Sequence, residues 1–128
     1  MCLQAPLAKV LGLGSAKQGA GHWWAQRLSA AGLVPLTLWF AVSIIGFENH
    51  GTHEMVTAWI AEPLHAIGLL LLVLTVVYHS NLGLQVVVED YVHGAAGVVT
   101  LVAVRFAHAA LAVAGAYAVI VVSVGAGQ

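Results

Sequence analysis

One stretch decides how the chain is read, and it runs His79-Ser80-Asn81-Leu82-Gly83-Leu84-Gln85-Val86-Val87-Val88-Glu89-Asp90-Tyr91-Val92-His93-Gly94. It closes a long apolar segment with a histidine, and the chain's only aspartate follows eleven residues later, next to a tyrosine. If residues 64–88 form one helix, Asp90 lies about 16 Å beyond His79 along the helix axis. The stretch therefore predicts one buried ligating side chain within the apolar segment and one pair of polar side chains at its edge.

The composition indicates a membrane protein. Apolar residues make up 61% of the 128 residues and charged residues only 7%, whereas an ordinary soluble domain carries about 25% charged residues. The excess apolar surface is expected to face lipid, and the length allows one small domain. A formal net charge of -1 excludes the basic surface that nucleic-acid binding requires. The lone Cys2 has no partner for an internal disulfide.

We expect an all-α membrane protein with three transmembrane helices, at about residues 28–47, 64–88 and 98–124, each long enough for a hydrocarbon core of about 30 Å. Pro35 predicts a kink in the first span. The repeat of Ala110, Ala114 and Ala118 beside Gly115 predicts that the third span packs closely against other spans, in this chain or in another. Residues 1–21 are expected to form a polar, irregular tail before a membrane domain at 22–128. Residues 48–62 are expected to form a solvated loop with one interfacial turn.

The distribution of basic residues predicts the orientation. Lys9, Lys17 and Arg27 precede the first span, the first loop has no Lys or Arg, and Arg105 follows the second connection. By the positive-inside rule, the N-terminus and the Asp90-Tyr91 corner lie on the cytoplasmic side and the C-terminus on the periplasmic side. The N-terminal residues lack the Arg- and Ser-rich pattern of a mitochondrial targeting segment. We therefore expect a bacterial inner membrane, with the mitochondrial inner membrane as the alternative.

From the residues alone, the polar groups of the second span each have two interpretations. A histidine inside a span faces protein or a cofactor, so His79 either makes interhelical hydrogen bonds or ligates haem iron through a neutral imidazole. Asp90 and Tyr91 either end a helix at the lipid interface or serve a ligand, in which case the Tyr91 phenol donates a hydrogen bond to a carbonyl oxygen and the Asp90 carboxylate orients a cationic partner or relays protons. His50 and His53 have a metal-like spacing, but no third ligand supports a site there.

Two blocks resemble the small hydrophobic membrane-anchor subunits of succinate dehydrogenase, also called cytochrome b small subunits, in the alphaproteobacterial form. The first consists of His79-Ser80, Gly83, Val87 and residues 90–94, because this family shows a histidine eleven residues before Asp-Tyr. The second is Gly14-Ser15-Ala16-Lys17 followed by Gly21-His22-Trp23-Trp24-Ala25-Gln26-Arg27. Together with three spans, the blocks cover most of the chain.

The resemblance implies specific roles for five residues. His79 would be an axial ligand of a b-type haem shared with the larger anchor subunit. Tyr91 would contact the ubiquinone headgroup, and Asp90 would support that site. Arg27 could pair with a haem propionate, with a purely interfacial role as the alternative, and His22 could do so less strongly.

The resemblance also implies partners and a function. The chain would tether the flavoprotein and iron–sulfur subunits, together with the larger cytochrome b anchor, and would lack catalytic activity alone. It would form part of the site where ubiquinone accepts electrons from succinate in the tricarboxylic acid cycle. Alternatives are a fumarate reductase anchor and a small transporter or proton channel whose histidines relay protons. His65, fourteen residues before His79, leaves a two-haem arrangement open; one haem is preferred.

Overall fold

A computed structural model describes residues 16–47 and 51–125, and in these ranges all regular structure is helical. The helices are α2 (Ala16–Phe47), α3 (His53–Ala61), α4 (Pro63–Tyr91) and α5 (Gly94–Gly125). Three of them are long and apolar enough to cross a membrane, over Ala20–Phe47, Pro63–Tyr91 and Gly94–Gly125. The prediction of an all-α protein with three spans is confirmed.

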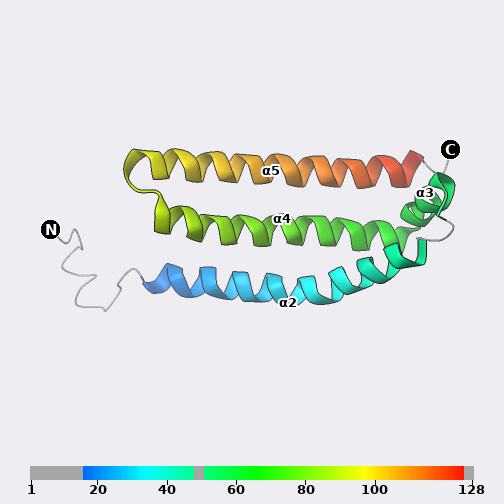
Figure 1. Cartoon of the computed structure of the whole chain (residues 1–128), viewed down its shortest axis with the longest axis horizontal. Helices are drawn as coiled ribbons and strands as arrows, with labels where there is room; N and C mark the ends of the chain where they lie inside the picture. Colours follow the sequence, from blue (N-terminus) through cyan, green and yellow to red (C-terminus); the bar gives the residue numbers. More distant parts are fainter. Residues whose placement is uncertain (1–15, 48–50, 126–128) are drawn as a thin grey trace.

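The three long helices lie side by side in one layer, with α4 between α2 and α5 (Figure 1). The short helix α3 closes one end of the layer, where it packs against α5 and α4. The α4–α5 connection lies at the opposite end, beside the start of α2 (Figure 1). The layer places the polar stretch around His79 against α2 and the Asp90-Tyr91 corner at its end.

Burial is sparse because the layer has two open faces. Among the described residues, the buried apolar side chains are Leu69, Leu72, Leu82 and Val88, all on α4. Large apolar side chains on all three long helices are exposed instead. An apolar exterior of this extent suits lipid and partner subunits rather than water.

The helix α2 starts earlier than the sequence pattern predicted. It begins at Ala16, inside the segment 1–21 that was expected to be irregular; residues 1–15 lie outside the described ranges. Ala16, Lys17 and Gln18 are strong helix formers. A helix that crosses the membrane can therefore extend through them, beyond its membrane-spanning part. The helix continues through Pro35 and bends toward α4 in its C-terminal part (Figure 1), as a proline inside a helix predicts.

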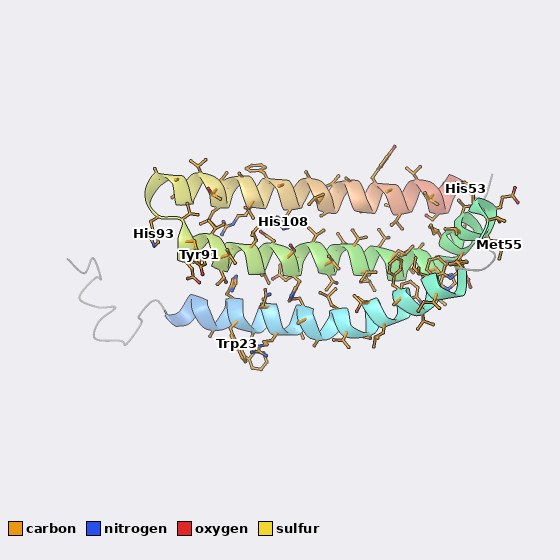
Figure 2. The ribbon with its side chains drawn as sticks, viewed as in Figure 1. Trp23, His53, Met55, Tyr91, His93 and His108 are labelled. Atoms are coloured by element: carbon orange, nitrogen blue, oxygen red, sulfur yellow. The ribbon has the colours of Figure 1, made fainter. Side chains whose placement is uncertain are left out.

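The first loop contains a helix of nine residues, α3, where the sequence predicted only one turn. Thr52 caps it, because its hydroxyl oxygen accepts a hydrogen bond from the Met55 backbone nitrogen at 3.3 Å. The apolar side of α3 packs on the other helices, whereas His53 and Met55 are exposed (Figure 2). His50, the second half of the metal-like pair, lies outside the described residues.

The third long helix also starts earlier than predicted, because the connection from α4 consists of only Val92 and His93. Gly94 has a φ of 70°, a conformation that is costly for residues with a side chain. Gly97 is buried, and a Cβ atom there would overlap the carbonyl oxygen of Val92. Two glycines therefore allow α5 to turn back directly on α4.

Glycines also permit close packing between the helices. A Cβ atom on Gly68 would lie 2.8 Å from the Trp39 ring of α2, and one on Gly115 would lie 2.6 Å from a methyl group of Val73. The third span thus approaches α4 through Gly115. The predicted stripe of Ala110, Ala114 and Ala118 is exposed on α5, so it makes no tight packing within this chain.

The corner provides a test of this packing. We expect Gly97→Ala to destabilise the protein by about 1–3 kcal/mol, because the added methyl group forces the backbone near Val92 to shift. The measurement is the midpoint of thermal unfolding of the full chain in detergent. Gly46→Ala is the control, since a Cβ atom there meets nothing within 4 Å. Equal midpoints for the two variants would contradict the tight corner.

Candidate functional site

His79 projects from the middle of α4 toward α2 and contacts two of its side chains. Its Nδ1 atom lies 2.9 Å from the hydroxyl oxygen of Ser29. Its Nε2 atom lies 3.3 Å from the side-chain nitrogen of Gln26. The Ser29 hydroxyl also reaches the backbone carbonyl oxygen of Gln26 at 3.0 Å. Both ring nitrogens of His79 therefore have partners on the neighbouring helix.

The α2 face toward this histidine is polar at one-turn intervals. His22, Gln26 and Ser29 follow one another at spacings of four and three residues, which places them on one side of the helix. Ser29 is the buried polar residue of the described part of the chain, at 8% exposure. His22 Nε2 and Gln26 Oε1 are buried without a hydrogen-bond partner. The site thus holds polar atoms that the described residues leave unpaired.

Gly83 lies one turn after His79 on α4 and faces the Gln26 side chain. A Cβ atom on Gly83 would meet the Gln26 side-chain nitrogen at 3.5 Å, an ordinary van der Waals distance. The backbone of Gly83 therefore lies against the residue that contacts His79.

A groove of about 600 Å³ opens beside this polar cluster, between α2 and α4. Its lining is mostly apolar and includes small residues; it consists of Ala25, Leu28, Ser29, Ala31, Gly32, Leu74, Thr75 and Tyr78. Ser29 belongs to both the groove and the His79 contact. The groove is open on one side, so a ligand seated in it would also meet whatever covers this face.

The Asp90-Tyr91 corner lies at the other end of the same stretch. Both residues are exposed, and the Tyr91 ring is 80% exposed at the end of α4, next to the turn into α5 (Figure 2). Nothing else in the described residues covers this phenol. A quinone site that used it would need walls from other chains.

Arg27 lies on a different face of α2 from Gln26 and Ser29. Its guanidinium group stacks over the Trp23 ring, 5.2 Å from the ring centroid, and Trp23 points away from α4 (Figure 2). Within this chain Arg27 and His79 are not brought together. His22 is closer to the candidate site, on the same side of the helix as Gln26.

The other histidines of the spans are engaged elsewhere. His65 lies at the opposite end of α4, stacked on Trp59 with ring centroids 4.3 Å apart, and its Nδ1 lies 2.9 Å from the Trp59 carbonyl oxygen and 3.0 Å from Glu62. His108 lies between α4 and α5 (Figure 2), where its Nε2 is 3.3 Å from the Ser80 hydroxyl. Within the described ranges, no cluster of three His, Cys, Asp or Glu side chains could hold a metal ion.

Comparison with known proteins identifies the class. The chain matches, over residues 1–124, the family model described as the succinate dehydrogenase/fumarate reductase transmembrane subunit. It is 38% identical over 90 residues to a succinate dehydrogenase hydrophobic membrane anchor subunit of Rickettsia bellii, a match that covers 70% of each chain. It is 36% identical over 81 residues to a succinate dehydrogenase membrane anchor subunit of Reclinomonas americana, covering 61% of this chain and 67% of the relative. No solved structure is significantly similar to it.

Three helices long and apolar enough to cross a membrane, with a polar cluster between two of them, define a multi-pass membrane protein. The chain belongs to the family of succinate dehydrogenase/fumarate reductase transmembrane subunits. The resemblance stated from the sequence is thereby confirmed. This family membership favours an anchor over the alternative of a self-assembling transporter or proton channel.

Sequence reasoning singled out His79 but missed its partners. Ser29 and Gln26 carry no charge and look like ordinary polar interruptions of an apolar span. Their spacing from His22 was the available signal, because it makes one polar side on α2. Sequence alone could not show that this side faces His79 rather than another chain.

The aromatic cluster around His65 explains why α3 is held in place. Trp59 of α3 stacks on Trp39 of α2 at 5.5 Å and on His65, and such pairs are worth about 0.5–1.5 kcal/mol beyond the area they bury. An apolar cavity of about 300 Å³ under α3 includes Trp59 and Val56 in its lining.

We expect Trp59→Ala to loosen α3 from the bundle, because the stack on α2 and α4 is lost. In a Cys2→Ser background, a water-soluble thiol reagent should label Val56→Cys faster when Trp59 is replaced. Ala58→Cys is the control, since this position on the same helix is already exposed. An unchanged labelling rate at position 56 would show that the stack does not hold α3.

Proposed function

We propose that this chain is the small membrane-anchor subunit of a succinate dehydrogenase, seated in a bacterial inner membrane. The observation that carries the proposal is the family match over residues 1–124, which includes both the spans and the His79 site. The chain would hold the flavoprotein and iron–sulfur subunits at the membrane, together with the larger cytochrome b anchor. The N-terminus and the Asp90-Tyr91 corner would face the cytoplasm, with catalysis of succinate oxidation residing in the soluble subunits.

The residues around His79 fit a b-type haem. A neutral histidine binds iron through a ring nitrogen that carries no hydrogen, and Nε2 of His79 faces only the Gln26 amide at 3.3 Å. The apolar groove beside it offers about 600 Å³ with one open side. His79 would be one axial ligand, and the larger anchor would supply the second. When bound, the haem would supply a one-electron carrier within the membrane.

Two further residues would hold the propionates of the haem. His22 Nε2 is buried without a partner on the α2 face toward α4, so it is suited to hold a propionate. Arg27 would do so from the neighbouring face, after leaving its stack on Trp23. The contacts of His65 with Trp59 and Glu62 favour a structural role for that histidine and hence a single haem.

The haem assignment is tested by the reduced-minus-oxidised visible spectrum of the complex purified through this chain. His79→Ala should remove or shift the b-type band while the soluble subunits still co-purify, because an axial ligand is lost. His108→Ala is the matched control, since this histidine sits between α4 and α5 and contacts Ser80. A native spectrum in the His79 variant would refute the ligand role.

The Asp90-Tyr91 corner would form part of the ubiquinone site. The Tyr91 phenol can donate a hydrogen bond to a quinone carbonyl oxygen, and its 80% exposure leaves it free to face a ligand bound between subunits. The Asp90 carboxylate beside it can orient a cationic partner or relay a proton. Ubiquinone would accept electrons there from the iron–sulfur subunit. A fumarate reductase anchor would use the same architecture in the opposite direction.

We expect Tyr91→Phe to lower kcat/KM for ubiquinone roughly 5- to 150-fold, because loss of the donor leaves a polar partner unsatisfied at a cost of about 1–3 kcal/mol. Succinate oxidation with an artificial acceptor should be unchanged. Tyr117→Phe on α5, also largely exposed, is the control and should keep normal quinone reduction. Equal kcat/KM values for the two variants would remove Tyr91 from the site.

A further inference from the structure

We propose that Ser29 is a positioning residue that fixes the tautomer and the ring orientation of His79, so that Nε2 is free of hydrogen and ready to bind iron. The inference rests on the proposed haem function for its consequence, but its structural content concerns only the hydrogen bonds between α2 and α4. It adds a residue that neither sequence block singled out for a role.

The number of hydrogens available at Ser29 decides the tautomer of His79. The Ser29 hydroxyl has one hydrogen and two neighbours, the Gln26 carbonyl oxygen at 3.0 Å and His79 Nδ1 at 2.9 Å. A carbonyl oxygen can only accept, so this contact is a hydrogen bond only if Ser29 donates to it. Ser29 must then accept from Nδ1, which therefore carries the imidazole hydrogen. The opposite arrangement would leave two oxygen atoms 3.0 Å apart with no hydrogen between them.

The second ring nitrogen agrees with this assignment. With the hydrogen on Nδ1, a neutral imidazole presents a lone pair at Nε2, and the Gln26 side-chain amide can donate to it across 3.3 Å. A doubly protonated ring would place two donors against each other at this point. Both contacts of the His79 ring are therefore hydrogen bonds when the hydrogen is on Nδ1.

The hydrogen bond between the Gln26 amide and Nε2 of His79 is weak. Its contact is long for a hydrogen bond, and its Oε1 atom is buried without a partner. Because an unsatisfied buried oxygen is unfavourable, the free energy cost of moving this amide away is small. Gln26 therefore covers Nε2 of His79 through a contact that is easily given up, whereas Ser29 makes two good contacts and stays in place.

The bond from Nδ1 to Ser29 also has an electronic consequence. Ser29 is 8% exposed, so water competes little for the hydrogen bond. A metal-bound histidine that donates its other N–H is held in orientation and becomes a more basic ligand, and loss of such an outer partner typically costs about 10- to 100-fold in metal affinity. A more basic ligand stabilises ferric over ferrous iron, so removal of the bond should raise the midpoint potential.

The first experiment uses the whole complex. Ser29→Ala should lose haem to excess apomyoglobin about 10- to 100-fold faster, with a more positive midpoint potential. Ser29→Thr keeps the hydroxyl and should restore both values. Ser43→Ala is the matched control, because Ser43 on the same helix bonds a backbone carbonyl, that of Trp39 at 2.9 Å, and contacts no histidine in the described residues.

The second experiment needs no haem. Solid-state NMR of the full chain in bilayers, with ¹⁵N-labelled histidine and His79→Ala to assign the signal, reports which ring nitrogen carries the hydrogen. We expect protonated Nδ1 in the native chain and a mixture of tautomers in Ser29→Ala. A native Nε2–H tautomer would overturn the proposal.

The two experiments separate the two proposals. If His79→Ala loses the haem band but Ser29→Ala keeps the native haem-loss rate and potential, the positioning role is wrong and the haem assignment stands. If His79→Ala keeps the native band, the haem assignment fails and Ser29 positions no iron ligand. If Ser29→Thr behaves like Ser29→Ala, bulk rather than the hydroxyl is responsible, and the proposal is again overturned.

Discussion

A histidine at membrane depth has to find hydrogen-bond partners within the protein, and this requirement ties α2 to α4. In hydrocarbon an unpaired polar group costs several kcal/mol, and both ring nitrogens of His79 are paired by residues one turn apart on α2. These contacts fix the rotation of α2 about its own axis. Once Gln26 and Ser29 face inward, the neighbouring Arg27 necessarily turns to another side, where it stacks on Trp23.

The same contacts explain why the layer is incomplete by itself. The central helix α4 has α5 on one side and α2 on the other (Figure 1), but no described helix covers the two broad faces of the layer. The buried apolar side chains of the described residues are all on α4, whereas large apolar side chains on all three long helices stay exposed. Lipid can cover some of this surface. The polar atoms of His22 and Gln26 that lack partners among the described residues are not satisfied by lipid, and neither is Asn81 Oδ1 on α4, so these positions need a ligand or another subunit.

The sequence predicted the broad architecture well, because length and hydropathy alone determine where a chain can cross a bilayer. The ends of the helices were less predictable. Ala16 begins α2 and Gly94 begins α5, since helices extend past the hydrocarbon core for reasons of local propensity and turn geometry that a hydropathy pattern does not contain. The helix α3 was missed as a full element because its nine residues depend on a Thr52 cap and on stacking against Trp39 and His65. At the site, His79 was predictable as an unusual residue, but its contacts with Ser29 and Gln26 bridge 50 and 53 positions of sequence.

The geometry of α4 determines how the two proposed sites relate to each other. His79 and Tyr91 stand twelve residues apart on one uninterrupted helix, which separates them by about 18 Å along the axis and turns them by about 120°. His79 points at α2, whereas Tyr91 projects in a different direction and is exposed at the end of the helix. Tyr91 therefore does not reach the groove between α2 and α4 that lies beside His79. Different surfaces of the partner subunits would therefore complete the two sites. Insertion of a single residue between them would rotate one site by about 100° relative to the other, so the eleven-residue spacing from His79 to Asp90 is a geometric requirement if both sites are to be served by the same partners.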